Sequence, residues 1–216
     1  KELWSIAAHR GAVTAVAAND AAVITGGADG KVAVWLRRSR ECLLQFTEHL
    51  KPVVAVIPDL VAPHLVHSAG KDRCVFTYDL KEERRTVGHQ MSKVGVGAFT
   101  SLSQRKDSEQ ELVTGGTDGK LLFWDCDIIE TPVLAMQDPS QSCVNGLAVS
   151  PSGRFIVLCS DDHHVKIFDI QRQTLLAAKL GHSARVLGVS WSPDERQVVS
   201  VGEDSCISVW NFYAVE

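Results

Sequence analysis

The chain has 216 residues, of which 45% are hydrophobic and 22% charged, proportions typical of a folded protein with a sizeable core. Lysine and arginine total 22 against 26 aspartate and glutamate, and the formal net charge of −4 argues against a dedicated nucleic-acid surface. No apolar run approaches the roughly 18 residues that a membrane span needs, so we expect a cytoplasmic protein without a membrane partner.

The start of the chain and its cysteines indicate whether the sequence is a fragment and in which redox compartment it folds. The sequence opens with Lys1-Glu2-Leu3-Trp4-Ser5, without Met and without the apolar core of a signal peptide. We therefore expect a fragment of a longer protein. The six cysteines contain no C-x-x-C pair, and we expect them to behave mostly as small buried side chains in a reducing compartment.

The first residues predict short antiparallel strands. The segments 13–17, 22–25 and 31–35 are rich in β-branched and aromatic residues, which favour a pleated, half-buried surface. Between the second and third, Asp29-Gly30 is a strong hairpin signal, because a two-residue turn needs positive φ, which Gly and Asp tolerate. A further edge strand, 42–46, then opens the next period, as 175–179 does later.

The same pattern recurs along the whole chain. Residues 25–35 and 114–124 are nearly identical, and three looser copies share their spacing. The period of roughly 42 to 46 residues, with four short strands in each, indicates blades of a β-propeller. Within the segment 1–216 the repeats span approximately residues 1–36, 37–79, 80–125, 126–169 and 170–212, and their aromatic marks are Trp35, Tyr78, Trp124, Phe168 and Trp210.

The last two repeats contain additional turn signals. Ser150-Pro-Ser-Gly153 and Ser192-Pro-Asp-Glu195 predict turns between two further strands. The hairpin position is filled by Asp162-His163 and Asp204-Ser205, which are poorer versions of Asp-Gly. Helical periodicity with caps at both ends is not seen.

These marks resemble those of the WD40 family, whose repeats carry a Gly-His pair, a Trp-Asp pair and an Asp in the tight turn between them. Gly88-His89, Gly181-His182 and Trp124-Asp125 match, together with the five spaced aspartates. The resemblance implies an all-β WD40 propeller of five repeats of four antiparallel strands. These are either part of a larger, about seven-bladed ring, which we favour, or an unusual five-bladed one. The resemblance also implies that the ring closes when residues 2–6 pair with the strand ending at Trp210.

The family resemblance further implies a hydrogen-bonded tetrad of His, Ser or Thr, Asp and Trp inside each blade. The fourth repeat has Ser140, Leu158 and Phe168 at three of these positions and keeps only Asp162, so we expect packing alone to hold that blade. The other sets are His9, Thr25, Asp29 and Trp35; His49, Ser68, Asp72 and Tyr78; His89, Thr114, Asp118 and Trp124; and His182, Ser200, Asp204 and Trp210.

A narrower resemblance concerns the order of several short segments. His9-Arg10, Val144-Asn145-Gly146 and Gly181-His182-Ser183 are similar to the C-terminal propeller of a cilia- and flagella-associated WD-repeat family of axonemal doublet microtubules. This resemblance implies a structural scaffold whose partners are tubulin and axonemal filament or inner-junction proteins. A centriolar microtubule-wall WD-repeat protein fits too. From another class, a regulatory adaptor or peptide reader, such as a ubiquitin-ligase substrate receptor, is the alternative.

Catalytic and cofactor sites are not predicted. His182, Ser200 and Asp204 include the residue types of a nucleophilic triad, but their arrangement recurs with the period of the fold, which marks structure. The Gly-Lys loops 26–31 and 115–120 lack the first Gly and the following Ser or Thr of a P-loop. The run 161–164 reads as a solvated turn, because adjacent residues of an extended segment point to opposite faces and cannot converge on a metal ion.

Binding is expected at the loops around one rim. By spacing from the histidines, Arg10, Lys51, Met91 and Arg185 are the candidate rim residues. The polar insert 101–110 in the third repeat is expected to be an exposed loop and a further candidate contact.

Overall fold

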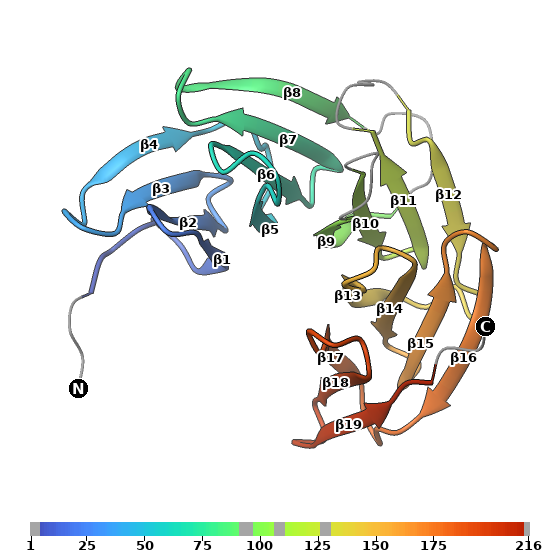
Figure 1. The fold of residues 1–216 in the computed structure, drawn as a ribbon. Helices are drawn as coiled ribbons and strands as arrows, with labels where there is room; N and C mark the ends of the chain where they lie inside the picture. Colours follow the sequence, from blue (N-terminus) through green and yellow to red (C-terminus); the bar gives the residue numbers. More distant parts are fainter. Residues whose placement is uncertain (1–4, 91–96, 106–110, 126–130, 214–216) are drawn as a thin grey trace. The chain divides into compact units, whose positions relative to one another are not determined.

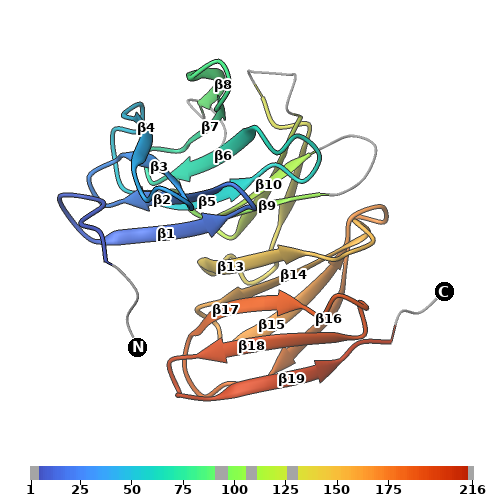
Figure 2. The ribbon, with the colours of Figure 1, turned by 60° about the vertical axis from the view of Figure 1, so that its left-hand side comes forward.

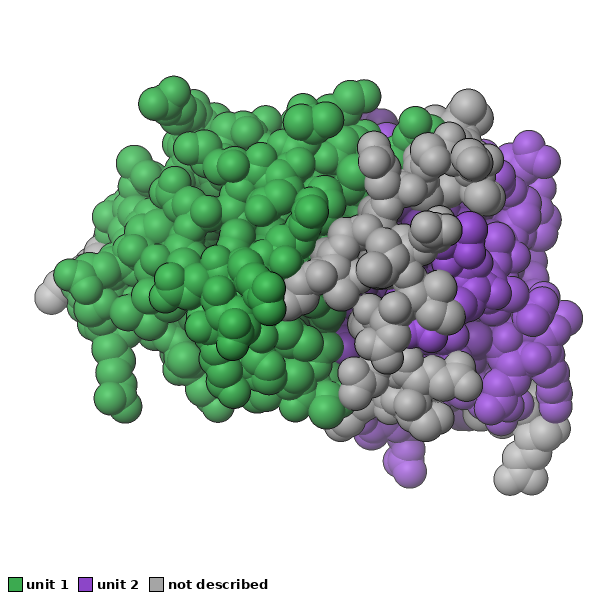
Figure 3. Space-filling view, turned by 90° about the horizontal axis from the view of Figure 1, so that it is seen from above, with its two compact units in different colours: residues 1–90 green, residues 91–216 purple. Residues whose placement is uncertain are grey.

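The computed structural model describes residues 5–90, 97–105, 111–125 and 131–213, with only the backbone described for 86–90. All regular structure in these ranges is β-strand, arranged in five antiparallel sheets. The chain forms two compact units, residues 1–90 and 91–216 (Figure 3). None of the described segments forms a helix long and apolar enough to cross a membrane.

The first unit contains two four-stranded sheets, which we call the first and second blades (Figure 1). In each blade the strands pair in chain order. The first consists of β1 (Val13–Ala18), β2 (Ala22–Gly27), β3 (Val32–Leu36) and β4 (Cys42–Phe46), and the second of β5 (Val53–Pro58), β6 (Leu65–Gly70), β7 (Cys74–Asp79) and β8 (Arg84–Gln90).

The second unit contains the third, fourth and fifth blades. The fifth, drawn in red tones in Figure 2, differs from the others in having three strands among the described residues. The third blade is β9 (Phe99–Gln104), β10 (Leu112–Gly116), β11 (Lys120–Trp124) and β12 (Leu134–Gln137); the fourth is β13 (Val144–Val149), β14 (Phe155–Ser160), β15 (His164–Asp169) and β16 (Thr174–Leu180); and the fifth is β17 (Val186–Trp191), β18 (Gln197–Gly202) and β19 (Ile207–Asn211).

The blade and the sequence repeat begin at different strands. The sequence pattern groups residues 42–46 with the strands that follow, but β4 pairs with β3 of the preceding repeat, Val32 lying opposite Phe46. In the same way β16 pairs with β15, Val165 lying opposite Lys179. Each outer strand therefore completes the blade before it, because a short loop returns it antiparallel to its neighbour.

The hairpin turns are longer than the two-residue turns that the sequence suggested. In the first blade the Gly30 N–H donates to Gly27 O (3.1 Å) and the Gly27 N–H donates to Lys31 O (3.0 Å), with φ of 76° at Gly30. Gly therefore supplies the left-handed residue, while Asp29 lies before it. The poorer signals also form this turn: Arg73, His163 and Ser205 take φ of 65°, 69° and 63°.

Apolar cores lie between successive blades within each unit. In the first unit Ile24 and Val34 are fully buried in one cluster with Val53 and Val56 of the second blade. In the second unit one cluster joins the third and fourth blades, and another joins the fourth and fifth. Burying such a side chain contributes about 1.5–3 kcal/mol. Packing between blades, in addition to pairing within them, therefore stabilises each unit.

The prediction that residues 101–110 form an exposed loop is wrong for residues 101–104, because they belong to β9 and Leu102 is buried. Residues 106–110 lie outside the described ranges. Of the segment 2–6, only Ser5 and Ile6 are described, and neither is in a strand. Five cysteines are described and free; Cys74 and Cys159 are buried, Cys143 is half-buried, and Cys42 and Cys206 are exposed, so burial is less general than expected.

Candidate functional site

The first blade contains a complete hydrogen-bonded tetrad. His9, in the segment before β1, contacts Asp29 Oδ1 through Nδ1 (3.0 Å) and Thr25 Oγ1 through Nε2 (2.9 Å). The indole N–H of Trp35, on β3, donates to the same hydroxyl (3.1 Å). The turn, β2, β3 and the incoming segment are thereby tied together around one threonine.

The fifth blade repeats this arrangement with serine in place of threonine. His182 Nδ1 lies 3.0 Å from both oxygens of Asp204, and its Nε2 lies 2.8 Å from Ser200 Oγ. The Trp210 indole donates to Ser200 Oγ (2.9 Å). Because Ser200 is fully buried, a substrate carbonyl cannot reach its hydroxyl, and the arrangement is suited to structural support.

The second blade holds a weaker version. His49 contacts Asp72 (3.0 Å) and Ser68 Oγ (2.7 Å), as in the other two blades. Tyr78 is buried, but its hydroxyl lies 3.5 Å from Ser68 Oγ, at the outer limit of a hydrogen bond. Its ring instead stacks on Phe46 with centroids 4.1 Å apart, so Tyr78 acts mainly through packing.

The third blade is described in part. Trp124 donates its indole N–H to Thr114 Oγ1 (2.9 Å), and Asp118 accepts the N–H of Lys120 (3.4 Å) in the turn. The backbone of His89 lies in β8, at the end of the preceding blade, and its side chain is outside the described part of the structure.

The fourth blade overturns the expectation that packing alone holds it. The Lys166 ammonium, almost completely buried, takes the place of the histidine. It donates to Asp138 Oδ2 (2.6 Å), Ser140 Oγ (2.8 Å) and Asp162, with Ser160 Oγ at 3.4 Å. In this blade a buried cation with two carboxylate partners thus replaces the histidine-centred tetrad. Leu158 and Phe168 do pack in the core, as the sequence implied.

A second buried network was missed by sequence reasoning. His67, fully buried on β6, contacts Asp59 Oδ2 through Nε2 (2.9 Å) and Thr77 Oγ1 through Nδ1 (2.9 Å). The other Asp59 oxygen accepts the N–H groups of Val61 (2.8 Å) and Ala62 (2.6 Å). A histidine within a strand, outside the period of the marks, was the available signal for it.

The tetrad aspartates also hold the loops beside them. A carboxylate oxygen of Asp29 accepts the N–H of Arg10 (3.1 Å), and Asp72 accepts that of Leu50 (2.9 Å). In the fifth blade Asp204 accepts the N–H of Ser183 (3.0 Å). Each tetrad therefore fixes the backbone of the residue that follows its histidine.

Hydrogen bonding keeps these carboxyl groups ionised. Burial would raise the pKa of Asp29 and Asp72, but hydrogen bonds from backbone N–H groups and from their histidines lower both below the ordinary value. For Asp204 the hydrogen bond from His182 has the largest effect and lowers the pKa to about 2. An ionised carboxylate accepts several N–H donors at once, as this site requires.

The loop residues that follow the histidines are candidate binding residues, and we call them the histidine rim of their unit: Arg10, Leu50 and Lys51 in the first unit, and Ser183 and Arg185 in the second. Arg10 and Lys51 are exposed, and Leu50 is 88% exposed. Arg185 is exposed and paired with Glu203 (2.7 Å and 3.0 Å), so part of its charge is compensated. Met91 lies outside the described residues.

Comparison with known proteins gives two kinds of match. A family model described as "WD domain, G-beta repeat" matches residues 1–35, 131–169 and 173–211. The chain is 29% identical to cilia- and flagella-associated protein 52 of Bos taurus over 95% of its length and 32% of that protein. It is 28% identical to the protein of the same name from Homo sapiens, over 95% of this chain and 33% of that one.

A more distant relative is the periodic tryptophan protein 2 homolog of Dictyostelium discoideum. The identity is 26% over 87% of this chain and 20% of that protein. The chain therefore spans between about a fifth and a third of the length of these relatives.

Proposed function

The chain belongs to the WD40 family of WD domain, G-beta repeat proteins, and on that premise we propose that it is a non-catalytic scaffold of ciliary or flagellar microtubules. The observation that carries the proposal is the similarity, over 95% of the chain, to proteins named for their association with cilia and flagella. Tubulin and axonemal filament or inner-junction proteins are its proposed partners.

The build of the blades supports a binding role. Each complete tetrad uses its polar groups internally, with the hydroxyl of Thr25 or Ser200 shared between a histidine and a tryptophan. The same tetrads hold the adjoining rim backbone by hydrogen bonds from Arg10 and Ser183 to the aspartates. Rigid elements that present exposed loop residues are the usual way in which a scaffold binds other proteins.

The histidine rim of the first unit has the composition of a protein contact. Leu50 offers apolar surface, and Lys51 next to it offers positive charge; Arg10, at the equivalent place in the first blade, adds a second positive charge. Interface cores combine such apolar anchors with a charged periphery that orients the partner. We propose that this part of the rim faces an acidic protein surface.

Co-sedimentation with polymerised microtubules tests the proposal. The chain is incubated with a series of microtubule concentrations at low and moderate salt, and the bound fraction is measured in the pellet. Saturable pelleting that persists at moderate salt is the expected result, because apolar contacts are not screened. Absence of pelleting by a chain shown to be folded by circular dichroism would contradict the microtubule role and favour the regulatory adaptor.

A further inference from the structure

Basic residues occupy successive loops of the first unit, at the end of the strands where the tetrad histidines lie. Arg10 is on the loop before β1, and Lys31 is on the turn after β2. Lys51 is on the loop before β5, and Lys71 and Arg73 are on the turn after β6. We call these five residues the cationic row. The row contains two members of the histidine rim and adds three further residues to them.

Backbone hydrogen bonds join the loops of the row within each blade. In the first blade the Ala28 N–H donates to Ala12 O (2.9 Å), so the turn lies against the loop that carries Arg10. In the second blade the Lys71 N–H donates to Pro52 O (2.9 Å) in the same way. These bonds fix the backbone of the loops before a partner arrives, which lowers the entropy lost on binding.

The two blades meet in the middle of the row. A Cβ added to Gly30 would lie 2.5 Å from His49 O and 3.4 Å from Lys51 O, so the turn of the first blade rests on the loop of the second. Lys31 directly follows Gly30, and it is therefore carried by a turn that touches the loop of Lys51. The row is thus continuous from one blade to the next.

The charge of the row is largely uncompensated. Among the described residues no ion pair to a carboxylate is found for four of its members: Arg10, Lys31, Lys51 and Lys71. Lys31 is half-buried, and the other three are exposed. Asp29 and Asp72, on the same turns, each contact a tetrad histidine at 3.0 Å. A carboxylate brought by a ligand would therefore find cations available.

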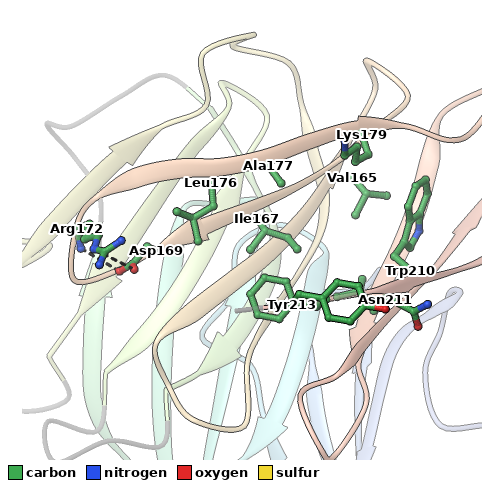
Figure 4. A pocket seen from close by; sticks show the side chains of 12 residues that line it. Val165, Ile167, Asp169, Arg172, Leu176, Ala177, Lys179, Trp210, Asn211 and Tyr213 are labelled. Carbon is green, nitrogen blue, oxygen red and sulfur yellow. Dashed lines mark hydrogen bonds and ion pairs between the residues drawn. The ribbon is translucent and has the colours of Figure 1, made fainter. Parts of the chain in front are cut away.

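The corresponding loops of the second unit have a different charge. The position before the turn aspartate, a lysine in the second blade, is Asp161 in the fourth blade and Glu203 in the fifth. Arg185 is paired with Glu203 (2.7 Å). At the other end of the fourth blade, Arg172 also has a carboxylate neighbour, because its Nε lies 4.0 Å from Asp169 (Figure 4). The available positive charge is therefore a property of the first unit's loops and not of every blade.

We propose that the cationic row binds an extended segment of a partner protein that is rich in glutamate or aspartate. One carboxylate can pair with one or two cations, whereas a row that crosses several loops is matched by carboxylates spread along a chain. A segment of like charges repels itself and stays extended, as this match requires.

The partner chemistry also follows from what stands within the row. Leu50, 88% exposed beside Lys51, offers contact to one apolar side chain of the segment. None of the five residues is aromatic, so the row itself lacks the stacking surface on which single-stranded nucleic acids are bound. The proposal rests on the scaffold function above and narrows the acidic partner surface to an extended acidic segment.

A synthetic acidic peptide tests the row directly. The probe is a fluorescently labelled oligoglutamate of about ten residues, which remains extended through self-repulsion. A Gly-Ser peptide of the same length is the uncharged control. Binding is measured by fluorescence anisotropy over a series of salt concentrations. We expect saturable binding of oligoglutamate that weakens steadily as salt rises, because exposed charges are screened, and no binding of the control peptide.

Lysine acetylation locates the contact. The chain is acetylated briefly with and without oligoglutamate, and the modification of each lysine is measured by mass spectrometry. Acetylation of Lys31, Lys51 and Lys71 should be slower with the peptide. Lys81 and Lys179 are exposed elsewhere and should react at an unchanged rate.

Two double variants separate the row from net charge. Lys51→Gln with Lys71→Gln should weaken oligoglutamate binding about four- to twentyfold, if each exposed pair contributes about two- to fivefold independently. Arg38→Gln with Lys81→Gln removes the same charge from exposed loops after β3 and β7, and should leave the affinity unchanged. Both should keep the urea midpoint of wild type, because all four positions are exposed.

Several results would overturn the proposal. One is the absence of saturable oligoglutamate binding, and another is equal weakening by both double variants. A third is slow acetylation of Lys51 and Lys71 without peptide, because the protein itself would then cover the row. A fourth is tighter binding of a DNA duplex of similar charge that depends on the same lysines, which would identify nucleic acid as the partner.

Microtubule pelleting is measured in parallel, so that the row and the scaffold function are tested separately. Pelleting that persists when oligoglutamate does not bind rejects the row and leaves the scaffold function intact. Oligoglutamate binding that depends on Lys51 and Lys71, without any pelleting, supports the row and rejects the microtubule role.

Discussion

The ammonium of Lys166 lies 2.6 Å from Asp138 Oδ2 inside the fourth blade, where both side chains are almost fully buried. Replacing Lys166 by Met would leave Asp138 without its cation, and an uncompensated buried charge costs about 3–5 kcal/mol. We expect Lys166→Met to lower the free energy of unfolding by about that amount, measured by urea denaturation. Among the described residues Asp138 Oδ1 lacks a hydrogen-bond partner, and without Lys166 its Oδ2 would keep only the Ser140 hydroxyl, which donates to it (2.5 Å).

Two further variants separate charge from packing at this site. Lys179→Met removes an exposed lysine from the adjacent strand and should change stability by no more than about 0.5 kcal/mol. Lys166→Met combined with Asp138→Leu replaces the main pair by apolar groups and should recover much of the loss. A cost below about 1 kcal/mol for the single Lys166→Met change would show that the pair is not important for folding.

The aromatic position of the tetrad is expected to matter differently in the first and second blades. Trp35→Phe removes an indole that donates to Thr25 Oγ1 at 3.1 Å, and also leaves space, so a loss of about 2 kcal/mol or more is expected. Tyr78→Phe removes a hydroxyl whose contact with Ser68 is 3.5 Å long, while its ring stacking on Phe46 remains. We expect less than about 1 kcal/mol for it in thermal or urea unfolding. Equal losses would contradict the distinction.

The acid limb of stability should depend on Asp204. Its pKa is lowered from 3.8 to about 2 in the folded chain by the hydrogen bond from His182 and by backbone donors. A depressed pKa contributes stability above the unfolded-state value, and this contribution is lost as pH falls through the folded-state value. The difference in unfolding free energy between wild type and Asp204→Asn is therefore expected to be full well above pH 3.8, to begin to shrink as the pH approaches 3.8, and to be mostly lost by about 2.

A control for the acid limb is Asp20→Asn, which changes an exposed loop carboxylate. Its difference from wild type should stay small throughout the same pH series, measured by denaturant unfolding at each pH. If the Asp204→Asn difference did not shrink in acid, the hydrogen bonds to the ionised carboxylate would not be the source of its stabilisation.

The period of the sequence predicts the fold well, because the marks are local. The strong pattern at Asp29-Gly30 and Trp35 indicates a turn and a strand from residues a few positions apart, and the structure has both. Which blade an outer strand joins is a question of tertiary pairing. The sequence pattern assigns residues 42–46 to the start of the next blade, and the register of Phe46 opposite Val32 shows that they complete the preceding one.

The tetrads were predictable in the blades that keep the family's histidine and aspartate. The fourth blade was not, because a lysine takes over the role of the histidine. His182 and Asp204 follow the family spacing and meet in the structure. Lys166 reaches the same place from a different strand position, through a long side chain, so alignment of marks does not find it.

The histidine rim of the first unit is the proposed contact with microtubules. Leu50 is 88% exposed and its backbone is fixed by Asp72, so it is a preorganised apolar contact beside the charge of Lys51. The double variant Leu50→Ser, Lys51→Glu should lower the affinity for microtubules about tenfold or more, as loss of an anchor residue does at other interfaces. Its stability should stay within about 0.5 kcal/mol of wild type, because both positions are on the surface.

The matched control carries the same kinds of change at the other end of the same strands. Leu60→Ser with Arg38→Glu alters an exposed leucine after β5 and an exposed arginine after β3, at the ends of these strands opposite to the tetrad histidines His9 and His49. Its pelleting should equal that of wild type at each salt concentration. If the control weakened pelleting as much as the rim variant, net charge rather than the rim would govern binding; if neither did, the histidine rim of the first unit would not be the microtubule contact.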